Sequence, residues 1–215
     1  VLSVARREDG TMAGFCSGIL LQVEGVKHVL HMGLSCIHVD DRRAGLARKL
    51  NDHMARTYLL TKVAPFGKMW ITSCACVLSS LGNIALYFDE LYPSPLYEGD
   101  PSDVHLQIAR AVNERYREQI YIEPDAAFDD HDFVFRGSVK DTVFEKTAED
   151  ARFQHRVPEL NDWYRGIMRF ENGDEVLQIG YATLWTGIKS LLGVASLREA
   201  RLKKNVELAP ATASK

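Results

Sequence analysis

The stretch that decides the fold is residues 33–50, GLSCIHVDDRRAGLARKL. Its first part continues an apolar run that begins at residue 26, and this predicts a strand over residues 26–39 with bulk on both faces, typical of a central strand. From residue 43 the spacing of apolar residues changes to that of an amphipathic helix of roughly 16 residues. The apolar positions of this helix are Leu46, Leu50, Met54 and Leu59.

The junction between this strand and this helix carries the chemistry. Backbone N–H groups at the start of a helix are unpaired and, with the helix dipole, attract an anion. Gly45 and Ala47 leave room for a phosphate to approach, and Arg42 and Arg43 add positive charge. The residues therefore predict a pyrophosphate site, although a solvated charged turn that pairs the two arginines with Asp40 and its neighbour is an alternative.

Outward from the junction, short strands and helices alternate. Residues 1–7 and 11–23 predict two strands that precede the central one, and their short turns favour an antiparallel meander. Residues 68–78 predict a further strand, and Ser80 is an N-cap for a helix over residues 81–91. The expected order is therefore β-β-β-α-β-α.

The second half predicts mostly helix. We expect helices over residues 103–118, 141–152, 159–170 and 175–192, and strands over residues 119–122 and 133–139. The predicted fold class is α/β, with a mixed, largely antiparallel sheet flanked by helices. Residues 1–140 form the expected core, and residues 141–215 form a mostly helical C-terminal extension packed on it.

Composition excludes several classes of function. The 215 residues carry 26 Lys and Arg against 29 Asp and Glu, a net charge of −3, so no basic domain predicts nucleic-acid binding. The most apolar late stretch, residues 176–194, is interrupted by polar side chains and predicts no transmembrane helix. The four cysteines lie in apolar segments, which favours free thiols and a cytoplasmic protein. Because Val1 opens the chain, we expect an N-terminally trimmed or processed protein.

The junction resembles a known motif. Val39 ends the strand and Arg42-x-x-Gly45-x-Ala47 opens the helix, which is similar to the Q/R-x-x-G-x-G/A acyl-CoA motif of the acetyl-CoA-dependent N-acetyltransferase (GNAT) superfamily. The element order is also similar, and the resemblance extends over residues 1–92. It implies an acyltransferase that moves an acetyl or other acyl group from acyl-CoA, its co-substrate, to the amine of a small molecule or peptide.

The resemblance also implies roles for individual residues. Backbone amides of residues 43–48 would bind the pyrophosphate, and the end of the strand at residues 37–39 would pair with the pantetheine arm. Asn83 would bind the pantetheine or position a water, and Tyr87 would be the general acid, with Phe88 in that position if the register shifts by one. The implied cofactor-binding residues are Ile37, Val39, Arg42, Arg43, Ala44, Gly45, Leu46, Ala47, Arg48 and Asn83.

The expected general base is a histidine. The family often places a carboxylate on the strand corresponding to residues 26–39, and this strand has no carboxylate. His31 has a suitable pKa and position, with His28 and His38 as weaker alternatives. No metal is expected, because the C-x-C pair formed by Cys74 and Cys76 lacks a second pair with zinc-like spacing.

Three departures from the family leave alternatives open. The link from Val39 to Arg42 is short, the family's first strand has no counterpart before Val1, and a long segment follows Leu91. One alternative is a non-catalytic acyl-CoA-binding or interaction module with the same fold. Another is an acyl-carrier-dependent synthase of N-acyl amino acids or related signals, which would need a longer apolar acyl pocket. A homodimer is also compatible with the sequence.

Overall fold

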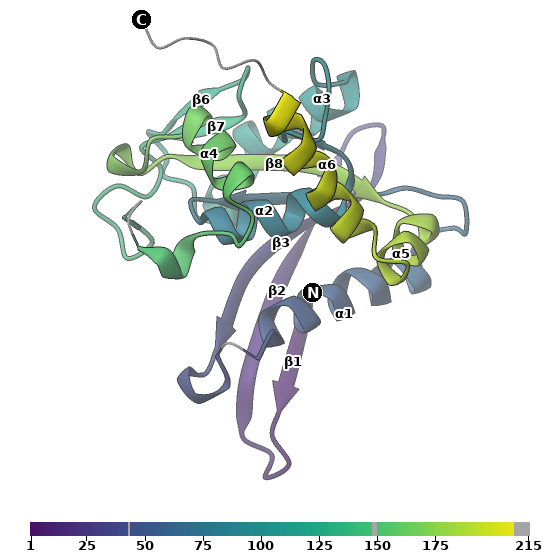
Figure 1. Cartoon of the computed structure of the whole chain (residues 1–215). Helices are drawn as coiled ribbons and strands as arrows, with labels where there is room; N and C mark the ends of the chain where they lie inside the picture. The colour runs from purple at the N-terminus through teal and green to yellow at the C-terminus, as the bar shows by residue number, and fades with distance from the viewer. Residues whose placement is uncertain (43, 148–149, 209–215) are drawn as a thin grey trace, which may run out of the picture.

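A computed structural model describes residues 1–42, 44–147 and 150–208. The protein is mixed α/β, with an open sheet of eight strands in which the pairing is mostly antiparallel, and with helices on both faces (Figure 1). The strand order is β1-β2-β3-β4-β8-β7-β6, and β5 pairs with β8 beside this path. The mixed, largely antiparallel sheet expected from the sequence is therefore confirmed. None of the helices in the described part of the chain is long and apolar enough to cross a membrane.

The first part of the chain confirms the predicted order of elements. An antiparallel meander of three strands is followed by α1, which returns the chain so that β4 pairs with β3 in parallel. Leu50, Met54 and Leu59 of α1 are buried against this half of the sheet, as the helical spacing predicted. The elements are β1 (Leu2–Arg6), β2 (Met12–Val23), β3 (Val26–Ile37), α1 (Leu46–Lys62), β4 (Met69–Ala75) and α2 (Leu78–Tyr87).

The two parallel strands part from each other halfway along. Their pairing runs from Val29 opposite Trp70 to Met32 opposite Ser73. Beyond this point β3 continues to Ile37 with β2 as its partner, while β4 continues with β8 as its partner. Figure 1 shows β2 and β3 extending away from the rest of the sheet. The facing edges of β3 and β4 are therefore unpaired beyond Met32 and Ser73.

The second half departs from the predicted helices. The helix expected over residues 175–192 is wrong in its first part, because β8 (Glu175–Ala182) lies at the centre of the sheet between β4 and β7. A strand buried on both faces gives a continuous apolar run, which periodicity does not distinguish from a buried helix. The described residues beyond 140 thus supply a central strand of the sheet as well as helices.

Other elements of the second half shift or change type. The strand expected over residues 119–122 is a short 3-10 helix, η2 (Glu118–Ile120). Within residues 141–152, where an α-helix was expected, the described residues form turns and the start of a 3-10 helix, η3 (Ala151–Phe153). A short strand that was not predicted follows α2. The remaining elements are β5 (Asp89–Tyr92), α3 (Asp103–Arg115), β6 (Ala127–Asp129), β7 (Val134–Arg136), α4 (Pro158–Ile167), α5 (Leu184–Leu191) and α6 (Val194–Leu208).

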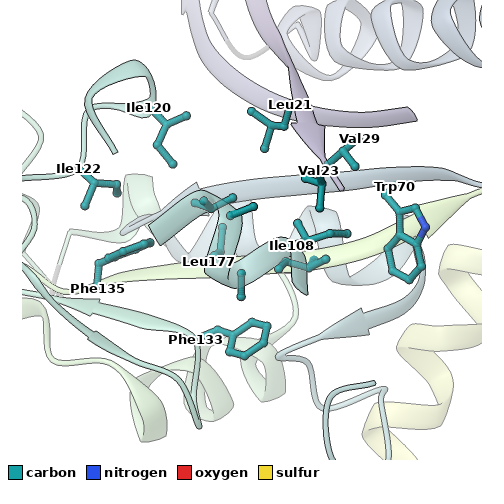
Figure 2. Close-up of a cluster of buried hydrophobic side chains, with 14 of the residues drawn as sticks. Leu21, Val23, Val29, Trp70, Ile108, Ile120, Ile122, Phe133, Phe135 and Leu177 are labelled. Carbon is teal, nitrogen blue, oxygen red and sulfur yellow. The ribbon is translucent and has the colours of Figure 1, made fainter. Parts of the chain in front are cut away.

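The sheet separates two packed layers. On one face α3 covers a cluster that includes Leu21, Val29, Trp70, Ile108 and Leu177 (Figure 2). On the opposite face α1, α2, α4 and α6 contribute to two further clusters, one under α1 and one between α2 and α4. Successive residues of β4 point to opposite layers, because side chains alternate along a strand. This alternation decides which side chains of β3 and β4 reach the candidate site.

Candidate functional site

A cavity of about 290 Å³ lies between α1 and α2, over the point where β3 and β4 part. Met32, Gly33 and Ser73 of the parting strands line it, so it opens at the unpaired strand edges. Its volume is close to the lower end of the range of roughly 300–1,000 Å³ that is common for small-molecule sites. The helices contribute Ala47, Arg48, Asn51, Asp52, Ala55, Arg56, Leu59, Ser80, Asn83, Ile84, Tyr87, Thr186 and Gly187, and the remaining lining residues are Ser35, Met69, Phe88 and Ala182.

The start of α1 borders this cavity. Gly45 is the N-cap residue with φ of 70°, a left-handed conformation that glycine adopts without strain. The first helical bond joins the amide of Lys49 to the carbonyl of Gly45 at 3.1 Å, so the amides of residues 46–48 belong to the unpaired first turn. Ala47 and Arg48 line the cavity itself. The predicted anion site is therefore adjacent to the cavity.

The loop before α1 is exposed. Arg42 and Ala44 are exposed, and Arg42 Nε donates to the carbonyl oxygen of Ile37 at 3.3 Å. Asp41 is paired with Arg7 and not with Arg42. Arg43 lies outside the described residues. The side chain of Arg42 thus contacts the end of β3 and is not paired with Asp41 in the way that the charged-turn alternative expected.

The residues predicted on α2 reach the cavity. Ser80, Asn83 and Tyr87 recur at helical spacing, so they share the face of α2 that lines it. Tyr87 accepts a hydrogen bond from Arg48 Nη1 at 3.4 Å, which links α2 to the first turn of α1. Phe88 lines the cavity as well, but it supplies an apolar wall. The hydroxyl in the cavity therefore belongs to Tyr87.

The end of β3 lies apart from the cavity. Ile37 is partly buried against the cluster under α1, and Val39 is 64% exposed in the 3-10 turn η1 (Val39–Asp41). Neither residue lines the cavity. The backbone edge that faces it belongs instead to the preceding residues of β3, of which Gly33 and Ser35 are in the lining.

The three candidate histidines do not line the cavity. His31 is 3% exposed and its Nδ1 lies 2.8 Å from Thr72 Oγ1, on the sheet face that α3 covers. Burial lowers the pKa of His31 to about 4, which keeps its imidazole neutral. His28 contacts Tyr58 at the other end of β3, and His38 is in the exposed turn after it. The alternation of β3 explains this outcome, because Met32 and not His31 points toward α1.

Sequence reasoning missed Asn51, which lies one turn after Ala47 on the same face of α1. Its Nδ2 donates to Ser35 Oγ at 2.9 Å and to the carbonyl of Ala47 at 3.0 Å. Its Oδ1 is buried and has no hydrogen-bond partner among the described residues. An unpaired buried acceptor is costly, by roughly 1–3 kcal/mol. Asn51 therefore places an unsatisfied acceptor within the wall of the cavity.

The charges of the cavity are few. Asp52 is the one carboxylate among the described lining residues, and it is paired with Arg56 at 2.9 Å. Both of these side chains are more than half exposed. No histidine or lysine of the described chain lines the cavity. The lining thus combines an arginine-bearing helix start with amides, hydroxyls and apolar side chains.

A separate group of titratable side chains lies at the end of β4. Ser138 Oγ donates to Glu175 at 2.6 Å, and burial raises the pKa of Glu175 to about 7. Burial and the nearby Glu175 also raise the pKa of the Cys74 and Cys76 thiols. Among the described residues, no group of three or more His, Cys, Asp or Glu side chains is placed to hold a metal ion. The two thiols are protonated at neutral pH.

Comparisons with known proteins give no independent guide to this cavity. No family model matches the sequence, and no characterised protein matches it either. The function is therefore inferred from the parted strands, the start of α1 and the residues between them.

Proposed function

We propose that this protein is an acyl-CoA N-acyltransferase of GNAT type, which transfers an acetyl or other acyl group from acyl-CoA to an amine. The observation that carries the proposal is the cavity between α1 and α2, because it joins the parted strands to the start of α1. The start of α1 is suited to a diphosphate, and the unpaired strand edges are suited to an extended organic arm. Acyl-CoA combines these two chemistries in one molecule.

The start of α1 would bind the diphosphate. The unpaired amides of residues 46–48 and the helix dipole favour an anion there. Gly45 leaves open space, since a Cβ added to it would contact nothing within 4 Å. Arg42 and Arg48 add positive charge on either side of Gly45. At position 47, a side chain larger than that of alanine would narrow the approach of the diphosphate.

The pantetheine arm would lie along the unpaired edge of β3. This arm carries amide groups, and an amide-bearing chain can add to a free strand edge through backbone hydrogen bonds. A rotation of the Asn51 side chain, whose Oδ1 is buried and unpaired, would let this oxygen accept a hydrogen bond from one of these amides. Asn83 lies on the opposite wall of the cavity and can bind the same arm. Donor binding would therefore satisfy a polar atom that is unsatisfied in the free protein.

The transfer step is a direct displacement at the thioester. The amine nitrogen attacks the carbonyl carbon, the C–N bond forms and the C–S bond breaks. Tyr87 donates its hydroxyl proton to the departing thiolate, and Arg48 orients that hydroxyl by its hydrogen bond. The proton lost by the amine passes to water or to Asp52, the carboxylate of the lining. His31 has no part in this step, because it is buried on the other face of the sheet.

A second candidate is a non-catalytic acyl-CoA-binding module. The observation that favours it is the absence of a histidine from the described lining, together with the engagement of Asp52 by Arg56. Such a module would bind the donor at the same residues and release no thiol. Donor binding is thus common to both candidates, and turnover separates them.

Calorimetric titration with CoA tests the binding step. Arg42→Glu should weaken CoA binding at least tenfold, whereas Arg110→Glu, a matched change on the exposed surface of α3, should not. Thiol release from acetyl-CoA over a panel of amines then tests turnover. Absence of CoA binding would contradict both candidates, and binding without turnover would favour the module.

A further inference from the structure

The cavity has two chemically different ends. Its polar end, at the parted strands, contains Ser35, Asn51, Ser73, Ser80 and Asn83. Its apolar end lies toward the start of β4 and the end of β8. The residues of this apolar end are Ala55, Leu59, Met69, Ile84, Phe88 and Ala182.

The apolar end is distant from the start of α1. Ala47 and Leu59 both line the cavity, and at 1.5 Å per residue they are about 18 Å apart along the axis of α1. Met69 and Ala182 are register partners in β4 and β8, and they form the floor at this end. The cavity therefore continues well beyond the residues that face the diphosphate site.

The polar groups near the apolar end are already paired. Thr186 lies at the start of α5, and its hydroxyl donates to Asp89 at 2.7 Å and accepts from the amide of Thr183 at 2.8 Å. Leu59, Met69 and Ala182 are 6%, 0% and 6% exposed. Asp52 and Arg56, which flank Ala55 on α1, are paired with each other at 2.9 Å. A ligand group at this end would thus meet mainly apolar side chains, and a polar group there would lose its hydrogen bonds to water.

We propose, on the basis of the acyl-CoA function above, that the preferred donor carries a medium-length straight acyl chain, such as octanoyl, which occupies the apolar end. The thioester then lies at the polar end, near Ser73 and Asn83. An acetyl group ends close to the thioester and would leave the apolar end unoccupied. Each methylene that the apolar end removes from water should tighten binding about fourfold.

Calorimetric titration of the full chain with CoA, acetyl-CoA and octanoyl-CoA tests this assignment. Octanoyl-CoA should bind at least about tenfold more tightly than acetyl-CoA, with a more negative heat capacity change. Octanoyl-phosphopantetheine, as a further ligand, separates a CoA donor from an acyl-carrier donor. Loss of most of the affinity without the nucleotide identifies CoA, and retention of the affinity identifies a carrier protein.

Two variants adjust the length of the cavity in opposite directions. Ala55→Leu fills the apolar end and should bring the octanoyl-to-acetyl affinity ratio to within about threefold. Ile84→Ala enlarges it and should move the preference toward dodecanoyl-CoA. Ala200→Leu, an equal change on the exposed side of α6, should leave the ratio at the wild-type value. Thermal melting confirms that each variant is folded.

The outcomes separate the two levels of the proposal. Equal affinity for acetyl-CoA and octanoyl-CoA, or a ratio that Ala55→Leu does not change, would overturn the acyl-chain assignment while CoA binding still supported an acyltransferase. Absence of binding by all of the CoA compounds would instead contradict the proposed function itself.

Discussion

Tyr87, the last residue of α2, accepts a hydrogen bond at 3.4 Å from Arg48 in the first turn of α1. The two residues lie on different helices, and the parted strands β3 and β4 run beneath the cavity between them. The group expected to protonate a leaving thiolate is thus in contact with the helix start expected to bind a diphosphate. This contact makes the general-acid role of Tyr87 directly testable.

Tyr87→Phe should lower kcat for thiol release by about 10²–10⁴-fold, since it removes the proton donor and keeps the ring. The KM for the donor should change little, because the donor's other contacts remain. Tyr121→Phe, which removes an exposed hydroxyl elsewhere, is the matched control. Unchanged kcat in Tyr87→Phe would show that another group protonates the thiolate.

Asn51→Ala should separate donor binding from stability. The change loses a hydrogen bond to Ser35, worth about 1 kcal/mol, but it also removes the buried unpaired Oδ1. The free protein should therefore melt at the same temperature or higher, while its affinity for CoA falls about tenfold. Thermal melting with and without CoA measures both effects. A variant that is less stable but binds CoA normally would assign Asn51 a purely structural role.

His31→Asn should test the exclusion of His31 from catalysis. The pKa of His31 falls from 6.5 to about 4 on burial, so the folded state releases this proton more readily than the unfolded chain. The free energy of unfolding is therefore highest above pH 6.5, where His31 is neutral in both states. It decreases as the pH falls toward 4, by on the order of 3 kcal/mol. Urea unfolding at several pH values should show a smaller loss in the variant. A fall in kcat with unchanged folding would restore His31 as the base.

Glu175 should give the stability a pH dependence of the opposite sign to that of His31, and Glu175→Gln should remove it. Burial raises the pKa of Glu175 from 4.5 to about 7, so the folded state holds this proton more tightly than the unfolded chain. Wild-type stability should fall as the pH rises from 4.5 through 7, and the variant should be more stable above pH 7 by on the order of 3 kcal/mol. Glu171→Gln, at an exposed position, is the control. An equal effect of both changes would show that Glu175 ionises normally.

Local pattern was sufficient for the first part of the fold. The strands before α1, the helix itself, β4 and α2 follow from period-two and helical spacing together with short turns. The same pattern was insufficient for β8, because Val176 and Leu177 are buried on opposite faces of the sheet. The sequence of β8 therefore shows neither period-two nor helical spacing of apolar residues. For the same reason, the sequence pattern did not show that a strand beyond residue 140 lies at the centre of the sheet.

The candidate site was predictable only where its residues are close in sequence. Ala47 and Arg48 belong to the motif, and Asn83 and Tyr87 share a face of one helix. Asn51 could have been found as the residue one turn beyond Ala47. His31 has the right pKa for a base in water, but the packing of α3 on its side of the sheet makes it a buried neutral residue.

The sequence by itself determined where the strands and helices of the first half lie, and that a helix start flanked by arginines follows β3, because these features depend on neighbouring residues. Only the tertiary structure decided that β3 and β4 part at Met32 and Ser73, and which face of each strand meets the cavity. It also decided that the cavity has an apolar end, since Leu59 and Ala182 come from distant segments that pairing and packing bring together. Sheet register and layer packing are long-range interactions, and no local spacing encodes them.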